Sequence, residues 1–251
     1  TGFLALCTKN LPSADVIPSE HFNTVTWTGD ASYPRSFNAG FQTDFLWIKS
    51  RSYTGNGIAL DTIRGSTKAL RTSTNGAETT NTFATFDSEG FNITGTFNES
   101  NETTVAWNWK AGGSASSNTN GTITSQVSAN PSAGFSIVSW THGSGSQSIG
   151  HGLSQKPDMI IVKGRSNVSS WWTWHKGLSS ETQSFIHVDT TSAAGANVNA
   201  WNNQAPTASV FYQKEYILSN NDTGIAYCFH SVDGYSKVGS FIGNGSETAG
   251  P

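Results

Sequence analysis

A repeated strand-like segment constrains this chain more than any other feature of its sequence. Asp44 to Ser52 reads Asp-Phe-Leu-Trp-Ile-Lys-Ser-Arg-Ser, and Asp158 to Ser166 reads Asp-Met-Ile-Ile-Val-Lys-Gly-Arg-Ser. The two copies are 114 residues apart, and the same offset relates Asp61 to His175. A fixed spacing of this kind indicates a duplicated structural module. The chain of 251 residues is therefore expected to hold two modules of ordinary size.

The spacing of apolar residues around the repeat is typical of β-strands. Val25 and Trp27 share one face of a segment whose other face carries threonines, and Phe135 to Thr141 repeats this alternation. Met159 to Val162 is instead apolar on both faces, which is the pattern of a strand covered on both sides. The second cover is expected from a long loop, another module or another subunit.

These patterns predict an all-β fold with two tandem antiparallel β-sandwich modules, lectin-like or jelly-roll-like. Partial repeat units are expected at both ends, because Leu4 to Cys7 resembles a closing strand and Ser240-Phe241 resembles an opening one. An edge strand over Thr122 to Val127 is the alternative for part of the central linker. The expected segments are 1–21 (a preceding unit's strand and a Pro-containing linker), 22–112 (first module), 113–134 (Gly/Ser/Asn-rich linker), 135–233 (second module) and 234–251 (a third unit or tail).

The charge content narrows the range of partners. Charged residues make up 12% of the chain and its net charge is −3, against roughly 25% charged residues in average soluble proteins. Without a Lys/Arg cluster the chain lacks the electrostatic footprint of nucleic-acid binding, and no apolar run has the length of a membrane span. Cys7 and Cys228 are too few for a disulfide framework, so each is expected to be a small buried thiol rather than half of a bridge.

Motifs for catalysis and metal binding are missing from the sequence, which predicts no catalytic residues, no metal site and no cofactor. His142 and His151 flank a Gly/Ser-rich hairpin and are expected to be hydrogen-bonding turn residues, since a metal site would need further ligands. A carboxylate pair could still hydrolyse glycosides from separate strands. The available carboxylates, each expected to be a solvated turn residue, are Asp61, Glu78, Asp87, Glu89, Asp189 and Glu215.

A basic pair ends each copy of the repeated strand, Lys49 with Arg51 and Lys163 with Arg165. Residues two apart share a face of a strand, so each pair makes a small basic spot. A phosphate or acidic-sugar site is one interpretation. A structural role, in pairing with Asp61 or a neighbour's carboxylate, is favoured because the pair recurs in both modules.

Aromatic residues of the second module suggest a sugar-binding surface. An indole ring suits the CH face of a sugar, and asparagine suits its hydroxyls. Alternation places Trp172 and Trp174 in the core. The candidate glycan contacts are therefore Trp171, Trp201, Asn202 and Asn203.

Several motifs resemble the repeat modules of virion structural proteins from marine tailed bacteriophages, and they extend over nearly the whole chain. The resemblance implies a β-rich, lectin-like module displayed on the particle, and it carries no catalytic residues over to this chain. The motifs are Leu-Cys-Thr-Lys-Asn-Leu-Pro (6–12), His-Phe-Asn-Thr-Val (21–25), Trp-Ile-Lys-Ser-Arg-Ser (47–52), Ala-Trp-Asn-Trp-Lys-Ala-Gly-Gly (106–113), Ile-Gly-His-Gly-Leu (149–153), Pro-Asp-Met-Ile-Ile-Val-Lys (157–163) and Gly-Tyr-Ser-Lys (234–237).

The expected function is a non-enzymatic virion protein that forms a tail fibre or surface projection at the particle surface. Its expected partners are other virion proteins, copies of itself, with a trimer favoured, and host surface glycans. The strand that is apolar on both faces supports oligomerisation, because a second subunit would cover it. The alternatives are a secreted carbohydrate-binding module or a capsid decoration protein, with a polysaccharide depolymerase less favoured.

Overall fold

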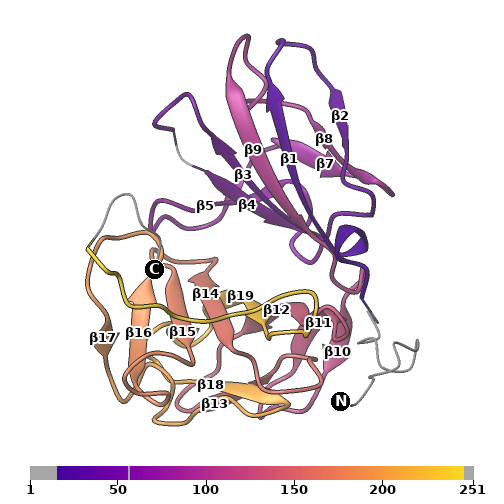
Figure 1. Ribbon diagram of the computed structural model, residues 1–251. Helices are drawn as coiled ribbons and strands as arrows, with labels where there is room; N and C mark the ends of the chain where they lie inside the picture. Colours follow the sequence, from indigo (N-terminus) through magenta and orange to yellow (C-terminus); the bar gives the residue numbers. More distant parts are fainter. Residues whose placement is uncertain (1–15, 56, 246–251) are drawn as a thin grey trace, which may run out of the picture.

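The computed structural model describes residues 16–55 and 57–245 and shows an all-β protein, as the strand patterns predict (Figure 1). The described helical structure is one 3-10 turn, η2 (Pro18–Glu20). The expected strand at Leu4 to Cys7 lies outside the described residues. The first module contains β1 (Phe22–Thr28), β2 (Arg35–Asn38), β3 (Phe45–Ser50), β4 (Ile58–Asp61), β5 (Lys68–Arg71), β6 (Thr79–Thr80), β7 (Ala84–Phe86), β8 (Gly90–Ile93) and β9 (Thr103–Trp109).

The second module begins earlier in the chain than the sequence repeat indicates. Its strands are β10 (Ser116–Asn118), β11 (Ser125–Asn130), β12 (Phe135–Thr141), β13 (Gln147–Gly150), β14 (Met159–Gly164), β15 (Trp172–His175), β16 (Ser184–His187), β17 (Gly195–Ala196), β18 (Val210–Gln213) and β19 (Thr223–Phe229).

Both modules use the same strand order. The larger sheet of the first module runs β1-β9-β3-β4-β5-β6, and the second module repeats it as β12-β19-β14-β15-β16-β17, with β11 and β10 added beside β12. The alanine shared by the two closing strands occupies the same place in each: Ala106 lies between Val25 and Ile48, and Ala226 lies between Val138 and Val162. The duplicated sequence segments therefore pair with their neighbouring strands in the same register in both modules.

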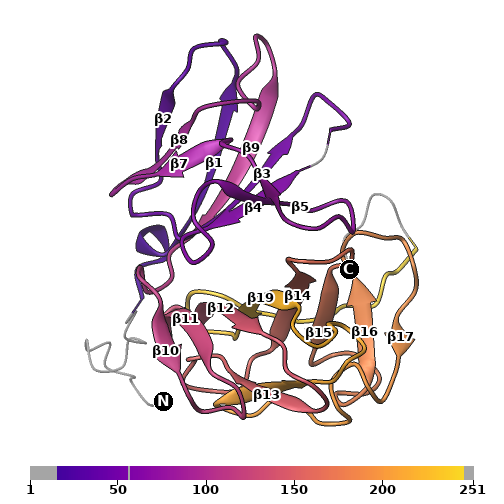
Figure 2. The same ribbon diagram turned by 180° about the vertical axis from the view of Figure 1, so that it is seen from behind.

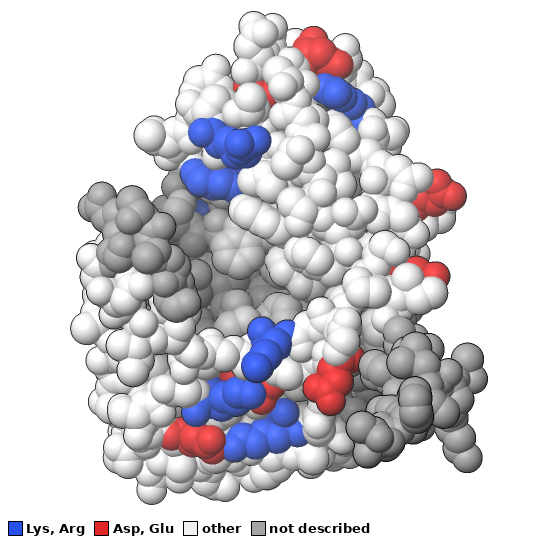
Figure 3. All heavy atoms as spheres, viewed as in Figure 1, with Lys and Arg blue, Asp and Glu red and all other residues white. Residues whose placement is uncertain are grey.

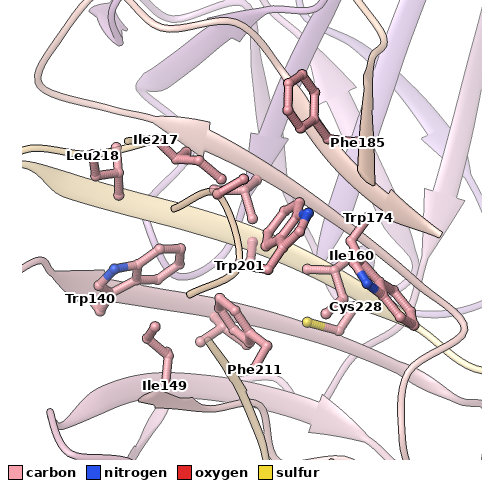
Figure 4. Close-up of a cluster of buried hydrophobic side chains, with 14 of the residues drawn as sticks. Trp140, Ile149, Ile160, Trp174, Phe185, Trp201, Phe211, Ile217, Leu218 and Cys228 are labelled. Atoms are coloured by element: carbon pink, nitrogen blue, oxygen red, sulfur yellow. The ribbon is translucent and has the colours of Figure 1, made fainter. Parts of the chain in front are cut away.

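A smaller sheet closes each sandwich, β2-β8-β7 in the first module and β13-β18 in the second. The two views show these smaller sheets on the outer sides of the molecule, with the larger sheets between them (Figures 1 and 2). Alternation along the repeated strand matches the structure, because Leu46 and Ile48 enter the first sandwich core whereas Phe45 points out of its other face. The second core is built around Trp140, Trp174, Trp201 and Phe211 (Figure 4).

The segment expected as the linker 113–134 instead holds two strands of the second module's larger sheet. It forms β10 and β11, which add antiparallel to β12 and overlap the alternative edge strand of the sequence analysis. Its serines do not need solvent, because Ser125 Oγ donates to the Gly150 carbonyl at 2.7 Å and Ser128 Oγ accepts from Gly112 N at 2.9 Å. Because such serines are hydrogen-bonded inside the sheet, a serine-rich strand can have the composition of a linker.

The strand expected to open a third unit near Ser240-Phe241 does not form within residues 234–245. A strand needs a paired neighbour for its backbone groups, and this segment has none among the described residues beyond the single bridge of Val232 with Ser236. Phe241 and Ile242 are 75% and 93% exposed.

The Cys228 thiol lies in the core of the second sandwich, in agreement with the expected buried cysteine. Burial raises its pKa to about 12. In a Cys7→Ser variant, we expect Cys228 to resist labelling by a thiol reagent at pH 8 and to react fully after denaturation, because a thiolate is the reactive form. Rapid labelling of the folded variant would contradict this placement. Cys7 itself lies outside the described residues.

Candidate functional site

The junction between the two modules is an apolar core formed by the outer faces of the larger sheets. Phe45 of β3 stacks on Tyr227 of β19 with ring centroids 4.0 Å apart. Trp171, just before β15, stacks at 6.4 Å on Trp47 and at 6.4 Å on Tyr227. Ile161 of the repeated strand is buried in the same cluster. The second cover that this strand requires is therefore the other module of its own chain.

This finding changes the argument for oligomerisation. The repeated strand is apolar on both faces because one face lines a sandwich and the other lines the junction. No second subunit is needed to cover it, so this feature no longer supports a trimer. Oligomerisation stays a prediction that needs other support.

A buried network of charged groups lies beside the apolar junction. Arg64 Nε is 2.6 Å from Asp61 Oδ2, and both side chains are fully buried. Tyr227 of the second module donates to Asp61 Oδ2 at 2.8 Å, and Arg64 donates to the Tyr227 oxygen at 3.2 Å and to Glu78 at 3.2 Å. Burial alone lowers the pKa of Arg64, but the carboxylate of Asp61 raises it above its ordinary value. The guanidinium thus stays charged and paired.

The pKa values of Tyr227 and Glu78 are shifted in opposite directions. Burial raises the pKa of the Tyr227 hydroxyl, so it remains a hydrogen-bond donor. Burial also acts to raise the pKa of Glu78, but the hydrogen bond from Arg165 and the charge of Arg64 lower it overall. The junction therefore holds an ionised Glu78 and a neutral Tyr227 at neutral pH.

The basic pairs of the repeated strand have different surroundings in the two copies. Arg165 donates to Glu78 of the first module through Nε at 2.9 Å and through Nη2 at 3.2 Å. Lys163 is buried and donates to the Gly164 carbonyl at 2.9 Å and to the Asn75 carbonyl at 3.3 Å. Burial lowers the pKa of Lys163 to about 8. In the second module the pair thus contacts the first module, with Glu78 as the carboxylate partner in place of Asp61.

In the first module the equivalent pair, Lys49 and Arg51, lies at the end of β3 near the protein surface. Lys49 donates to the Gly55 carbonyl, and Arg51 is exposed. On the face shown in Figure 3, the few charged side chains are scattered among uncharged ones, and the surface is hollowed between the two modules. The two basic pairs thus differ, because only the pair of the second module contacts the other module.

The two tryptophans expected to contact glycans are buried, which corrects their assignment. Trp171 is 1% exposed in the junction, where its Nε1 donates to the Arg71 carbonyl at 2.9 Å. Trp201 is 1% exposed in the second core, where its Nε1 donates to the Ser184 carbonyl at 2.9 Å. Neither ring has a free face for a sugar.

Asn202 and Asn203 form the turn that follows Trp201. Both have left-handed backbone conformations, with φ of 53° and 51°, which asparagine tolerates better than most residues. Asn202 accepts from Ser146 Oγ at 2.8 Å and Asn203 accepts from Gln183 Nε2 at 2.9 Å. These contacts give the asparagines a structural role in holding the loop over the core.

The candidate carboxylates are dispersed. Asp61 and Glu78 are ion-paired in the junction, Asp189 accepts from the Trp171 backbone at 3.0 Å, and Asp87 accepts from the Glu89 backbone at 3.0 Å in the β7–β8 turn. Asp61 and Glu78 were thus wrongly expected to be solvated.

No group of three or more His, Cys, Asp or Glu that could hold a metal occurs within residues 16–55 and 57–245. Among the same residues no helix is long and apolar enough to span a membrane.

His151 is the expected hydrogen-bonded turn histidine, now placed between two backbone partners. Leu153 N donates to its Nδ1 at 3.1 Å, and its Nε2 lies 3.2 Å from the Thr207 carbonyl. This arrangement accommodates the neutral ring with its proton on Nε2. Burial lowers the pKa of His151 to about 4. His142 is also buried, and burial lowers its pKa as well. Neither of its ring nitrogens has a hydrogen-bond partner among the described residues, so the expectation of a hydrogen-bonded ring is wrong for His142.

The pKa of His151 predicts an acid sensitivity with a defined sign. The unfolded chain takes up a proton near pH 6.5 and folded His151 does so near pH 4, so stability is lost as pH falls between these values. We expect the free energy of unfolding to drop by about 2 kcal/mol from pH 7.5 to pH 5 through this residue. Urea titrations of the wild type and a His151→Gln variant should show a smaller drop in the variant; an equal drop in both would contradict the assignment.

Two duplicated sandwiches that share one buried junction define an all-β, two-module protein. The chain belongs to the family described as a domain of unknown function, DUF7483, whose model matches residues 17–251. The matched region includes both modules and the junction. No curated protein and no solved structure matches the chain.

Proposed function

We propose that this chain is a structural protein of a bacteriophage virion, where it forms part of a tail fibre or surface projection. The observation that carries the proposal is the junction between the modules. In it Phe45, Trp171 and Tyr227 stack, and the ion pair of Asp61 with Arg64 lies beside them in the first module. An apolar core with buried ion pairs resists relative motion of the modules. A projection from a particle needs such a stiff unit. The resemblance of the sequence motifs to the repeat modules of marine phage virion proteins supports the same role.

Contacts with other virion proteins, and with copies of this chain, follow from the composition of the surface. Only 12% of the residues are charged, so little charge repulsion or desolvation opposes packing against a neighbour. Phe241 and Ile242 are large apolar side chains that are mostly exposed near the end of the described chain. We propose that another virion subunit covers them.

The proposal is tested on particles purified from the phage that encodes the chain. We expect mass spectrometry to find the chain in the particles at a fixed copy number, and electron microscopy with a gold-labelled antibody to place it on the tail. Labelling over the capsid would instead favour a decoration protein. Absence of the chain from washed particles, with the chain present in the culture medium, would overturn the proposal.

A further inference from the structure

A pocket of about 450 Å³ opens at one end of the first sandwich. It lies where β3 and β5 end and β4 begins, beside the loop from β8 to β9. Its apolar floor consists of Ile58, Phe83 and Phe97, which are at most 8% exposed and belong to the first sandwich core. The volume falls in the range of roughly 300–1,000 Å³ that is common for small-molecule sites.

The rim of this pocket combines an exposed aromatic ring with polar side chains. Tyr53 is 58% exposed, and Asn81, Arg71 and Glu99 are also exposed. The carboxylate of Glu102 is buried and accepts from the Glu99 backbone at 3.3 Å. An apolar floor below a few directional polar groups is the arrangement that fixes the orientation of a small ligand.

One wall of the pocket is held in an unusual backbone conformation. Phe97 has a φ of 82°, which is rare for a bulky residue and costs conformational energy. Its carbonyl accepts from Trp27 Nε1 at 2.9 Å and from Thr104 Oγ1 at 3.2 Å, and its ring meets Phe83 edge-on at 6.1 Å. These contacts fix the wall in place, and strained residues of this kind concentrate at binding sites.

The second module fills the equivalent space. Ile58 pairs with Arg71 between β4 and β5, and Trp172 takes the place of Ile58 in the pairing of β15 with β16. The Trp172 ring packs against Phe185 at 4.6 Å and against Tyr216 at 5.4 Å. The position that supplies Ile58 to the pocket floor thus carries a larger, packed side chain in the second module.

We propose that this pocket binds a neutral saccharide bearing an N-acetyl group. The Tyr53 ring offers a face to the sugar CH groups. The Asn81 amide can donate to and accept from sugar hydroxyls, and the carboxylates of Glu99 and Glu102 can accept from them. The acetyl methyl would reach the floor of Ile58, Phe83 and Phe97. Two glutamates against one arginine on the rim disfavour acidic sugars. The inference goes beyond the proposed structural role, because a stiff projection needs no such pocket and stands without it.

The test is ligand-observed NMR on the full chain with N-acetylglucosamine and, for comparison, glucose. We expect saturation transfer from the protein to the acetyl methyl protons, with weaker transfer to glucose. Ile58→Trp should abolish the signal by filling the pocket, because the second module accommodates a tryptophan at this position. Tyr53→Ala should weaken binding about tenfold through loss of the stacked ring.

The matched control is Tyr216→Ala, which removes a partly exposed tyrosine at the same end of the second module. We expect unchanged sugar binding in this variant. Circular dichroism and the thermal midpoint check the fold of every variant, and Tyr53→Ala serves if Ile58→Trp fails to fold, because Tyr53 is largely exposed. Absence of transfer to N-acetylglucosamine in the wild type, or binding that survives both pocket variants, would overturn the inference.

Discussion

Replacement of Asp61 by alanine is expected to lower the free energy of unfolding by about 3–5 kcal/mol. The change removes the only carboxylate that contacts Arg64 Nε in the described structure and leaves a guanidinium with a fully buried side chain. It also removes the acceptor of the Tyr227 hydroxyl, 166 residues away in the sequence. Glu78 remains as a partner of Arg64 Nη1 at 3.2 Å, but Arg165 shares this carboxylate. The buried guanidinium therefore loses its closest compensating charge, which costs more than the loss of the attraction itself. Urea denaturation followed by tryptophan fluorescence measures the effect.

A surface aspartate is the matched control for this variant. Asp233→Ala removes a carboxylate of the same kind at an exposed position, and the expected change is within about 0.5 kcal/mol. The double variant Asp61→Ala with Arg64→Met should recover part of the loss, because it also removes the buried guanidinium that has lost its closest carboxylate. A loss below about 1 kcal/mol in Asp61→Ala would show that Arg64 finds water in the folded protein.

Replacement of Trp171 by alanine is expected to cost about 3–5 kcal/mol and to uncouple the two modules. The indole fills the junction between Trp47 and Tyr227 and donates to the Arg71 carbonyl of the first module. Its removal leaves a cavity between the modules and an unpaired carbonyl. Differential scanning calorimetry should show one transition for the wild type and two for the variant.

Trp201→Ala is the matched control, because it also removes a buried indole ring but from a different core. Trp201 is equally buried but lies in the core of the second sandwich, away from the junction cluster. A similar loss of stability is expected, but it should fall on the second module's unfolding. If Trp171→Ala and Trp201→Ala gave the same pattern of transitions, the junction would not be what couples the modules.

The fold was largely accessible from the sequence because its main signals are local or repeated. The two apolar faces of the repeated strand follow from alternation, and the structure places Leu46 and Ile48 in one core and Phe45 in another. The offset between the copies identified equivalent strands, which pair in the same order in both modules. The added strands β10 and β11 were less visible, because the buried serines of β11 are paired with backbone groups that no local pattern identifies.

The assignments of individual side chains depended on contacts between distant segments. Alternation put Trp171 opposite the core residue Trp172, but alternation does not tell what covers the second face of a sheet. That face is the junction, so the ring is buried. Trp201 lies in a loop, as the sequence indicates, but this loop folds over the core of the second sandwich. The ring is therefore buried. The pocket of the first module likewise depends on Ile58 standing where its copy has Trp172.

By itself, the sequence determined the duplication, the strands and the two faces of the repeated strand, since these follow from spacing and from alternation along a pleated backbone. The tertiary structure alone decided that the modules cover each other, that Asp61 and Arg64 meet Tyr227, and that a pocket is open in one copy and filled in the other. The physical reason is that burial and pairing are properties of surfaces brought together from 100 or more residues apart. A local pattern records which side chains are apolar without recording what they contact.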